Sequence, residues 1–123
     1  MARILLIDDD PSIRTVLRCW LEKKGHDIDE AENGEEGLSQ FRSVGADLVI
    51  TDLFMPEREG LETTLHLRRM ENAPEVIVIS GHPSYAKIFL QTAKRLGART
   101  VLSKPFSPEE IIEAVNDALA KRK

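Results

Sequence analysis

The stretch "RILLIDDDPSIR", residues 3–14, joins a run of four branched apolar residues to three consecutive aspartates. Asp is favoured at the N-cap of a helix and Pro at its first position, so Asp10 and Pro11 predict the start of a helix. That interpretation leaves Asp8 and Asp9 without a structural role, directly after a segment typical of a buried strand. We therefore expect a strand that leads into a polar site.

The composition is that of an ordinary globular domain. The chain has 123 residues, 41% of them hydrophobic and 31% charged, so we expect one domain over residues 1–123 with a single fold. No apolar run approaches the ~20 residues that span a bilayer, and no signal-peptide pattern is present, so we expect a cytoplasmic protein without a membrane partner. The lone Cys19 allows no internal disulfide, and the net charge of −4 argues against direct binding of nucleic acid.

Short apolar runs predict the strands. They are "ILLI" at 4–7, "LVI" at 48–50, "VIVI" at 76–79 and "TVL" at 100–102. Their branched side chains are typical of parallel strands that are covered on both faces. The segment "HDIDEAE" at 26–32 alternates and is more polar, which predicts an edge strand.

Segments with helical spacing separate the strands. Asn33 predicts one helix start, and Ser107 with Glu110 predicts a capping box at the last helix. Gly45 and Gly97 mark helix ends. The repeated strand–helix order predicts an α/β fold with a parallel sheet, right-handed crossovers and helices on both faces.

Polar residues follow four of the five predicted strands. They are Asp8 and Asp9, Asp52, Ser80 and Lys104. Because the carboxyl ends of parallel strands meet at one edge of a sheet, we expect these side chains to lie together. Three converging carboxylates repel unless a cation neutralises them, and hard oxygen ligands favour Mg²⁺. With an added ammonium and hydroxyl group, the site is suited to hold a phosphoryl group beside a carboxylate.

Four segments together resemble the receiver domain of bacterial response regulators: "ILLIDDDPSIR", "DLVITDLFMPEREG", "VIVISG" and "LSKPFSPEEI". The resemblance covers essentially the whole chain. It implies a flavodoxin-like (βα)5 three-layer sandwich with a five-stranded parallel sheet of order 2-1-3-4-5. It also implies a phosphorylation-dependent signalling switch in a two-component phosphorelay, rather than an enzyme.

The resemblance implies that Asp52 accepts a phosphoryl group from a sensor histidine kinase or histidine phosphotransfer protein and loses it slowly. The implied cofactor is Mg²⁺, held by Asp9, Asp52 and the backbone carbonyl of Phe54, with Asp8 acting through water. In this family the position of Phe54 flanks the path of the hydrolytic water. We expect its bulky, apolar ring to slow dephosphorylation.

The implied switch uses two further residues. Lys104 would pair with a phosphate oxygen, and Ser80 would hydrogen-bond another, which couples the site to the surface of the fourth helix, fifth strand and fifth helix. An unidentified effector or a second copy in a homodimer would bind there. Val101 stands where many receivers have Tyr or Phe, which argues against a ring-flip mechanism. The Lys104–Pro105 peptide bond is expected to be cis.

A kinase-docking surface is also implied by the resemblance. It would be formed on the first predicted helix by Ile13, Arg14 and Leu17, and on the last loop by Pro105 and Phe106.

Two other functions remain open. Asp8 and Asp10 form a D-x-D motif after a strand, which resembles the nucleophile and acid of haloacid-dehalogenase-like phosphatases, although this leaves Asp52 without a role. A binding module of the same fold that is never phosphorylated is the other alternative, but it has no need for the full set of strand-end residues.

Overall fold

A computed structural model describes residues 1–53, 60–81 and 83–121. Strands and helices alternate along the chain. In order they are β1 (Arg3–Ile7), α1 (Pro11–Glu22), β2 (Asp27–Ala31), α2 (Gly34–Val44), β3 (Leu48–Asp52), α3 (Gly60–Arg68), β4 (Glu75–Ser80), α4 (Pro83–Arg95), β5 (Thr100–Ser103) and α5 (Pro108–Lys121). Within the described ranges, every helix is too short or too polar to cross a bilayer.

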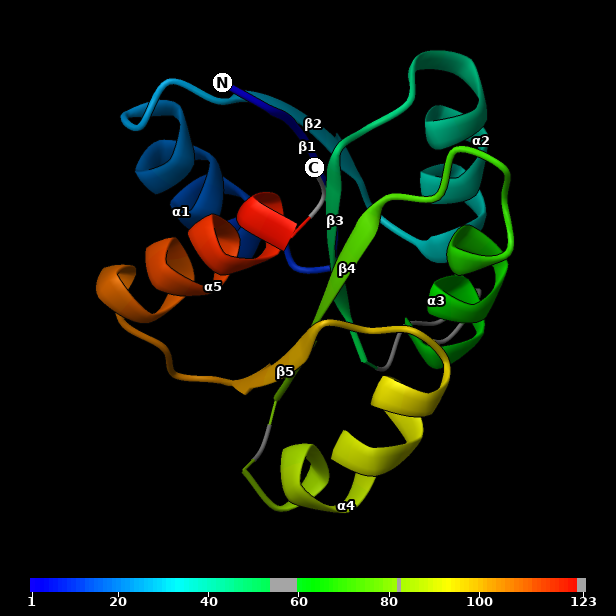
Figure 1. Cartoon of the computed structure of the whole chain (residues 1–123). Helices are drawn as coiled ribbons and strands as arrows, with labels where there is room; N and C mark the ends of the chain where they lie inside the picture. Colours follow the sequence, from blue (N-terminus) through cyan, green and yellow to red (C-terminus); the bar gives the residue numbers. More distant parts are fainter. Residues whose placement is uncertain (54–59, 82, 122–123) are drawn as a thin grey trace.

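The strands form one parallel sheet in the order β2-β1-β3-β4-β5 (Figure 1). The predicted strand order and the edge position of β2 are therefore confirmed. In the register of β1 and β3, Ile7 lies opposite Thr51, so the residues that follow β1 lie beside Asp52 at the end of β3. The strand order reverses between these strands, and this is where open α/β sheets bind ligands.

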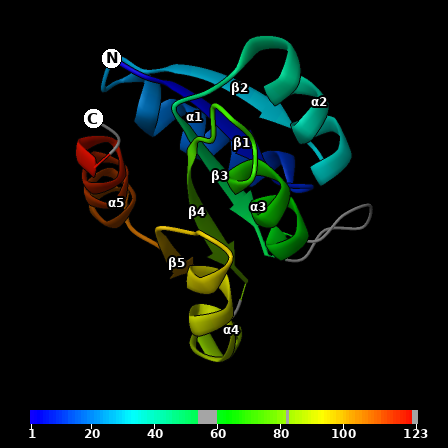
Figure 2. The same ribbon diagram turned by 45° about the vertical axis from the view of Figure 1, so that its right-hand side comes forward.

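Helices cover both faces of the sheet. Figures 1 and 2 show α1 and α5 on one face and α2, α3 and α4 on the other. The alternation of β1 follows this division, because Ile4 and Leu6 pack in the first cluster whereas Leu5 and Ile7 pack in the second. All four side chains are fully buried. A strand apolar on both faces is what the run of branched residues predicts.

The caps confirm three predicted helix starts. The Asp10 carboxylate accepts the Ser12 N–H at 2.8 Å, and the Asn33 side chain caps α2 in the same way. Ser107 and Glu110 form the reciprocal capping box, with bonds of 2.9 and 3.1 Å. These bonds satisfy N–H groups that have no partner within the helix.

Candidate functional site

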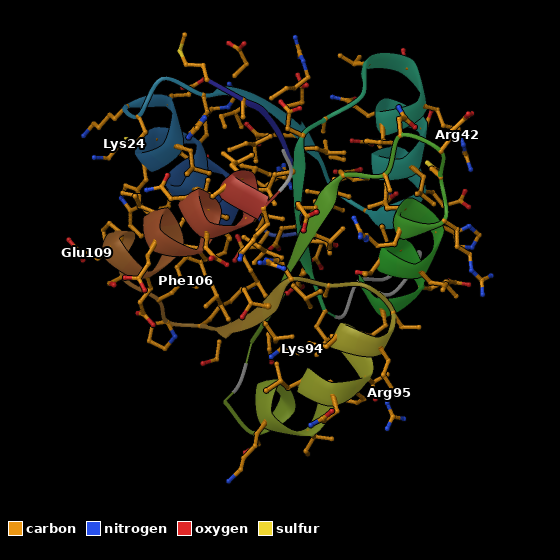
Figure 3. The ribbon with its side chains drawn as sticks, in the orientation of Figure 1. Lys24, Arg42, Lys94, Arg95, Phe106 and Glu109 are labelled. Carbon is orange, nitrogen blue, oxygen red and sulfur yellow. The ribbon has the colours of Figure 1, made fainter. Side chains whose placement is uncertain are left out.

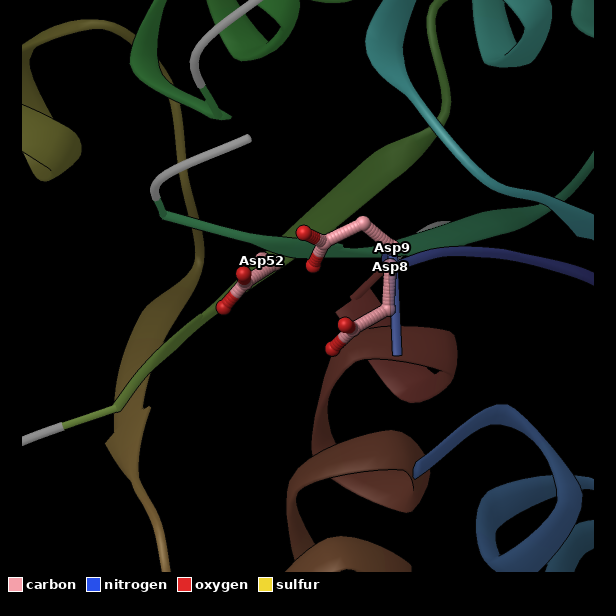
Figure 4. Close-up of side chains that lie close together, drawn as sticks. All are labelled: Asp8, Asp9 and Asp52. Carbon is pink, nitrogen blue, oxygen red and sulfur yellow. The ribbon is translucent and has the colours of Figure 1, made fainter. Parts of the chain in front are cut away.

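Three carboxylates meet at the carboxyl ends of β1 and β3 (Figure 4). Asp8 and Asp9 directly follow β1, and Asp52 is the last residue of β3. One carboxylate oxygen from each residue lies within 4.8 Å of the others. The expected convergence of these three side chains is confirmed, and the pairing of β1 with β3 is its cause.

The environment of Asp52 disfavours its charge. The side chain is almost buried, with the residue 8% exposed. Burial, followed by the negative charge of Asp8, raises the pKa of Asp52 to about 6, although Lys104 acts in the opposite direction. Burial also raises the pKa of Asp8. A cation bound among these groups would offset the cost of keeping them ionised.

Lys104 brings one positive charge into this cluster. Its Nζ lies 3.4 Å from Oδ2 of Asp8 and 3.5 Å from Oδ1 of Asp52. Burial lowers the pKa of the Lys104 ammonium, but the two carboxylates outweigh burial and raise it overall. The backbone N–H of Lys104 also donates to the backbone carbonyl of Ser80 at 2.7 Å, and this bond joins the ends of β4 and β5. The Lys104–Pro105 peptide bond is cis, as the resemblance implies.

The donor set fits a hard divalent cation. Carboxylate oxygens are the ligands that Mg²⁺ prefers, and three ionised carboxylates exceed the single charge of Lys104. Oδ1 of Asp8 accepts the N–H of Asp10 at 2.9 Å, whereas Asp9 is exposed. This arrangement suits direct binding by Asp9 and a more remote contribution from Asp8.

The sequence also predicts site roles for Ser80, Phe54 and Asp10. Ser80 is buried at the end of β4. Phe54, whose backbone carbonyl is an expected metal ligand, lies outside the described residues. Asp10 caps α1 through Ser12, so its carboxylate is engaged by the helix and is poorly placed to act as the acid of a D-x-D phosphatase.

An apolar pocket of about 340 Å³ adjoins the site. It is lined by Ile13, Val16, Trp20, Gly81, Lys104, Pro105 and Phe106. Trp20 and Phe106 pack edge to face with ring centroids 6.2 Å apart. The expected docking role of Leu17 is wrong, because this residue is only 1% exposed and packs in the core. Val16, which is 39% exposed, lines the pocket instead.

Two arginines on α1 make contacts that were not predicted from the sequence. Arg14 donates to Glu30 and to the carbonyl of Asp8, and Arg18 donates to the other oxygen of Glu30. A pair of cations one helical turn apart, followed by an acidic edge strand, was an available signal for the ion pairs with Glu30 but not for the contact with the Asp8 carbonyl.

Comparisons with known proteins agree with this geometry. The family model of the response regulator receiver domain matches residues 4–116. Protein PilH of Pseudomonas aeruginosa is 36% identical over 98% of this chain and 99% of its own length. Chemotaxis protein CheY of Halobacterium salinarum is 32% identical over 95% of this chain and 96% of its own length. The chain matches only 48% of the transcriptional regulatory protein ResD of Bacillus subtilis, at 32% identity over 98% of this chain.

Solved structures give the same result. A response regulator receiver domain protein from Clostridium thermocellum has a TM-score of 0.89 at 29% identity, with 99% of this chain and 97% of that chain covered. The receiver domain of the Francisella response regulator 1452 has a TM-score of 0.90 at 27% identity, with both chains fully covered.

Proposed function

The chain belongs to the response regulator receiver domain family of two-component systems, and from this premise we propose that Asp52 is its phosphoacceptor. The observation that carries the proposal is the setting of this carboxylate. Asp52 is almost buried at the end of β3, grouped with Asp8 and Asp9, and 3.5 Å from the ammonium of Lys104. A nucleophile beside fixed charges of both signs suits phosphoryl transfer, which depends on positioning and electrostatics.

In the proposed reaction, a carboxylate oxygen of Asp52 attacks the phosphorus of a phosphohistidine or of a small acyl phosphate. The bond from phosphorus to the leaving group breaks, the leaving group takes the electron pair, and an aspartyl phosphate forms. A pKa of about 6 leaves most Asp52 ionised at pH 7 and able to attack. Water later attacks the phosphorus, which releases inorganic phosphate and restores the carboxylate.

Mg²⁺ is the cofactor of this proposal. Asp9 and Asp52 would hold it together with the backbone carbonyl of Phe54, and Asp8 would act through water. When bound, the ion supplies positive charge that offsets the carboxylates and the phosphoryl oxygens. Lys104 would pair with one phosphoryl oxygen, and the hydroxyl of Ser80 would donate to another.

The modification would change the surface formed by α4, β5 and α5. Phosphorylation adds about −1.5 to −2 charge at the end of β3. Ser80 and Lys104 lie at the ends of β4 and β5, so their movement toward the phosphoryl group would alter this surface. Lys94 and Arg95 on α4 and Glu109 on α5 give it charges of both signs (Figure 3). An effector protein or a second copy of the chain would bind there.

A sensor histidine kinase or histidine phosphotransfer protein would supply the phosphoryl group. We assign its docking to the apolar pocket beside Lys104, because that pocket combines partly exposed apolar side chains with Lys104, whose ammonium lies 3.5 Å from the reacting carboxylate.

Chemical trapping tests the proposal. The chain is incubated with acetyl phosphate and Mg²⁺, reduced with borohydride and digested, and the modified aspartate is identified by mass spectrometry. We expect label on Asp52 that is absent in Asp52→Asn and after addition of EDTA. Label on Asp8 would favour the phosphatase alternative. A folded chain that binds Mg²⁺ but takes no label from acetyl phosphate or from any kinase would be a binding module.

A further inference from the structure

The edge strand β2 fixes the backbone of Asp8 on both sides. The Asp8 N–H donates to the carbonyl of Ala31 at 3.1 Å. The Asp8 carbonyl accepts a bond from Nη1 of Arg14, whose Nε donates to Oε1 of Glu30 at 2.9 Å. Because Glu30 and Ala31 are adjacent, one short segment of β2 holds both backbone polar groups of Asp8, the N–H directly and the carbonyl through Arg14.

Glu30 is itself held in place. Its second oxygen accepts Nε of Arg18 at 2.6 Å, and Nη2 of Arg18 donates to the carbonyl of Ile28 at 3.0 Å. The side chain of Arg14 is 16% exposed and that of Glu30 is 30% exposed, so water screens this pair less than a surface ion pair. Arg14 therefore has little freedom to leave the Asp8 carbonyl.

Asp8 begins the turn that carries the acidic cluster. Its Oδ1 accepts the N–H of Asp10 at 2.9 Å, which closes the turn around Asp9. The direction of the Asp9 carboxylate therefore depends on how the backbone of Asp8 is anchored. Arg14 provides one of the anchors from outside the turn.

We propose that Arg14, oriented by Glu30, is a positioning residue that holds the Asp8–Asp10 turn in the conformation that binds Mg²⁺. This inference rests on the proposed function, since it concerns the same cation site. It gives Arg14 a role other than the kinase docking that the resemblance implies, because its Nε and Nη1 donate to Glu30 and Asp8.

A positioning role and a simple charge effect predict opposite results. Removal of a cation near the site would, through charge alone, strengthen the binding of Mg²⁺. Loss of the anchor would weaken binding instead, as is usual when a group that orients metal ligands is removed. The sign of the change in Mg²⁺ affinity therefore distinguishes the two.

The test is a calorimetric titration of the metal-free chain with MgCl₂ at pH 7 and fixed ionic strength. We expect Arg14→Met to raise the dissociation constant about tenfold. Arg14→Lys keeps the charge, but an ammonium cannot reproduce the fixed geometry in which the guanidinium donates to both Glu30 and the Asp8 carbonyl. It should therefore also weaken the binding of Mg²⁺. Glu30→Gln should have a smaller effect in the same direction. Arg3→Met is the matched control, because Arg3 also pairs with a carboxylate of β2, Asp29 at 2.9 Å, but lies at the start of β1, the end of that strand away from the acidic turn.

Denaturant unfolding without Mg²⁺ measures the stability of each variant separately. An Arg14→Met variant that folds and binds Mg²⁺ as tightly as the unaltered chain, or more tightly, overturns the inference alone. Failure of the unaltered chain to bind Mg²⁺ overturns the proposed metal site and the inference together. If Arg14→Met does not fold, then Arg14→Lys and Glu30→Gln decide, and unchanged affinity in both overturns the inference.

Discussion

Nζ of Lys104 lies 3.5 Å from Oδ1 of Asp52, so the proposed nucleophile is paired with a cation in the unmodified protein. Lys104 lowers the pKa of Asp52, although burial and Asp8 leave it raised overall. In Lys104→Met, we expect the pKa of Asp52 to rise above 6 and the initial rate of phosphorylation by acetyl phosphate at pH 7 to fall at least about tenfold.

Two measurements check this expectation. NMR titration of the Asp52 carboxyl group reports its pKa, and the trapping assay reports the rate. Lys94→Met removes an exposed lysine from α4 and serves as the control. An unchanged rate in Lys104→Met would contradict the role assigned to this lysine.

Asp52→Asn should stabilise the metal-free protein at neutral pH. The pKa of Asp52 is about 6 in the folded protein and 3.8 for an ordinary aspartate. At pH values between 3.8 and about 6, Asp52 holds a proton in the folded chain that it has released in the unfolded chain. The stability contributed by the neutral group is therefore full below pH 3.8 and is lost as the pH rises through 6. Asn remains neutral, so its gain at pH 7 is about 3 kcal/mol.

Denaturant unfolding at pH 7 and pH 4 without Mg²⁺ tests this pH dependence. The gain from Asp52→Asn should shrink at pH 4, where the unaltered carboxyl is largely protonated. Glu109→Gln, which removes an exposed carboxylate from α5, is the control. Addition of MgCl₂ at pH 7 should stabilise the unaltered chain more than Asp52→Asn. An equal gain at both pH values would rule out titration as its cause.

Local patterns made most of the fold predictable. Branched apolar runs identify strands buried on two faces, and short capping motifs at Asp10, Asn33 and Ser107 identify helix starts. The convergence of Asp8, Asp9 and Asp52 was predictable for a topological reason, since each residue lies at the carboxyl end of a parallel strand. Such an inference needs only the order of the elements.

Contacts between side chains and distant backbone groups could not be predicted in this way. Nothing in the spacing of the sequence indicates that Arg14 binds the carbonyl of Asp8, because the contact depends on how α1 is rotated over β2. The same rotation decides that Leu17 is buried while Val16 is exposed. Helical periodicity places both residues on the apolar side of the helix, but it does not give the exposed fraction of each one.

Gly60→Ala should destabilise the fold near the site. A Cβ atom at Gly60 would lie 2.0 Å from the backbone oxygen of Asp52 and 2.9 Å from Cα of Leu53. These are backbone atoms, so the start of α3 and the end of β3 would have to separate. We expect a loss of about 3 kcal/mol in the free energy of unfolding, together with weaker Mg²⁺ binding.

Gly81→Ala is the matched control for this substitution. A Cβ atom at Gly81 meets no atom within 4 Å, and the backbone there does not have a positive φ. Its free energy of unfolding should be unchanged or slightly higher. Equal stabilities of the two alanine variants would show that β3 and α3 separate easily at Gly60.

Val16→Asp should slow phosphorylation by a kinase without slowing phosphorylation by acetyl phosphate. Val16 is 39% exposed and lines the apolar pocket beside Lys104, so a carboxylate there would weaken docking of an apolar partner surface without disturbing the core. Acetyl phosphate needs no docking surface, and its rate should be unchanged. Transfer from a kinase should fall about tenfold or more, since charges at the centre of an interface are disfavoured.

The kinase is first identified by transfer from a panel of autophosphorylated kinases to the unaltered chain. Val44→Asp is the matched control, because Val44 is 51% exposed and ends α2, on the other face of the sheet. If both valine variants accept phosphoryl groups from the kinase at the unaltered rate, docking does not use the pocket. A loss with both donors would instead mean that Val16→Asp disturbs the reacting carboxylate through Lys104.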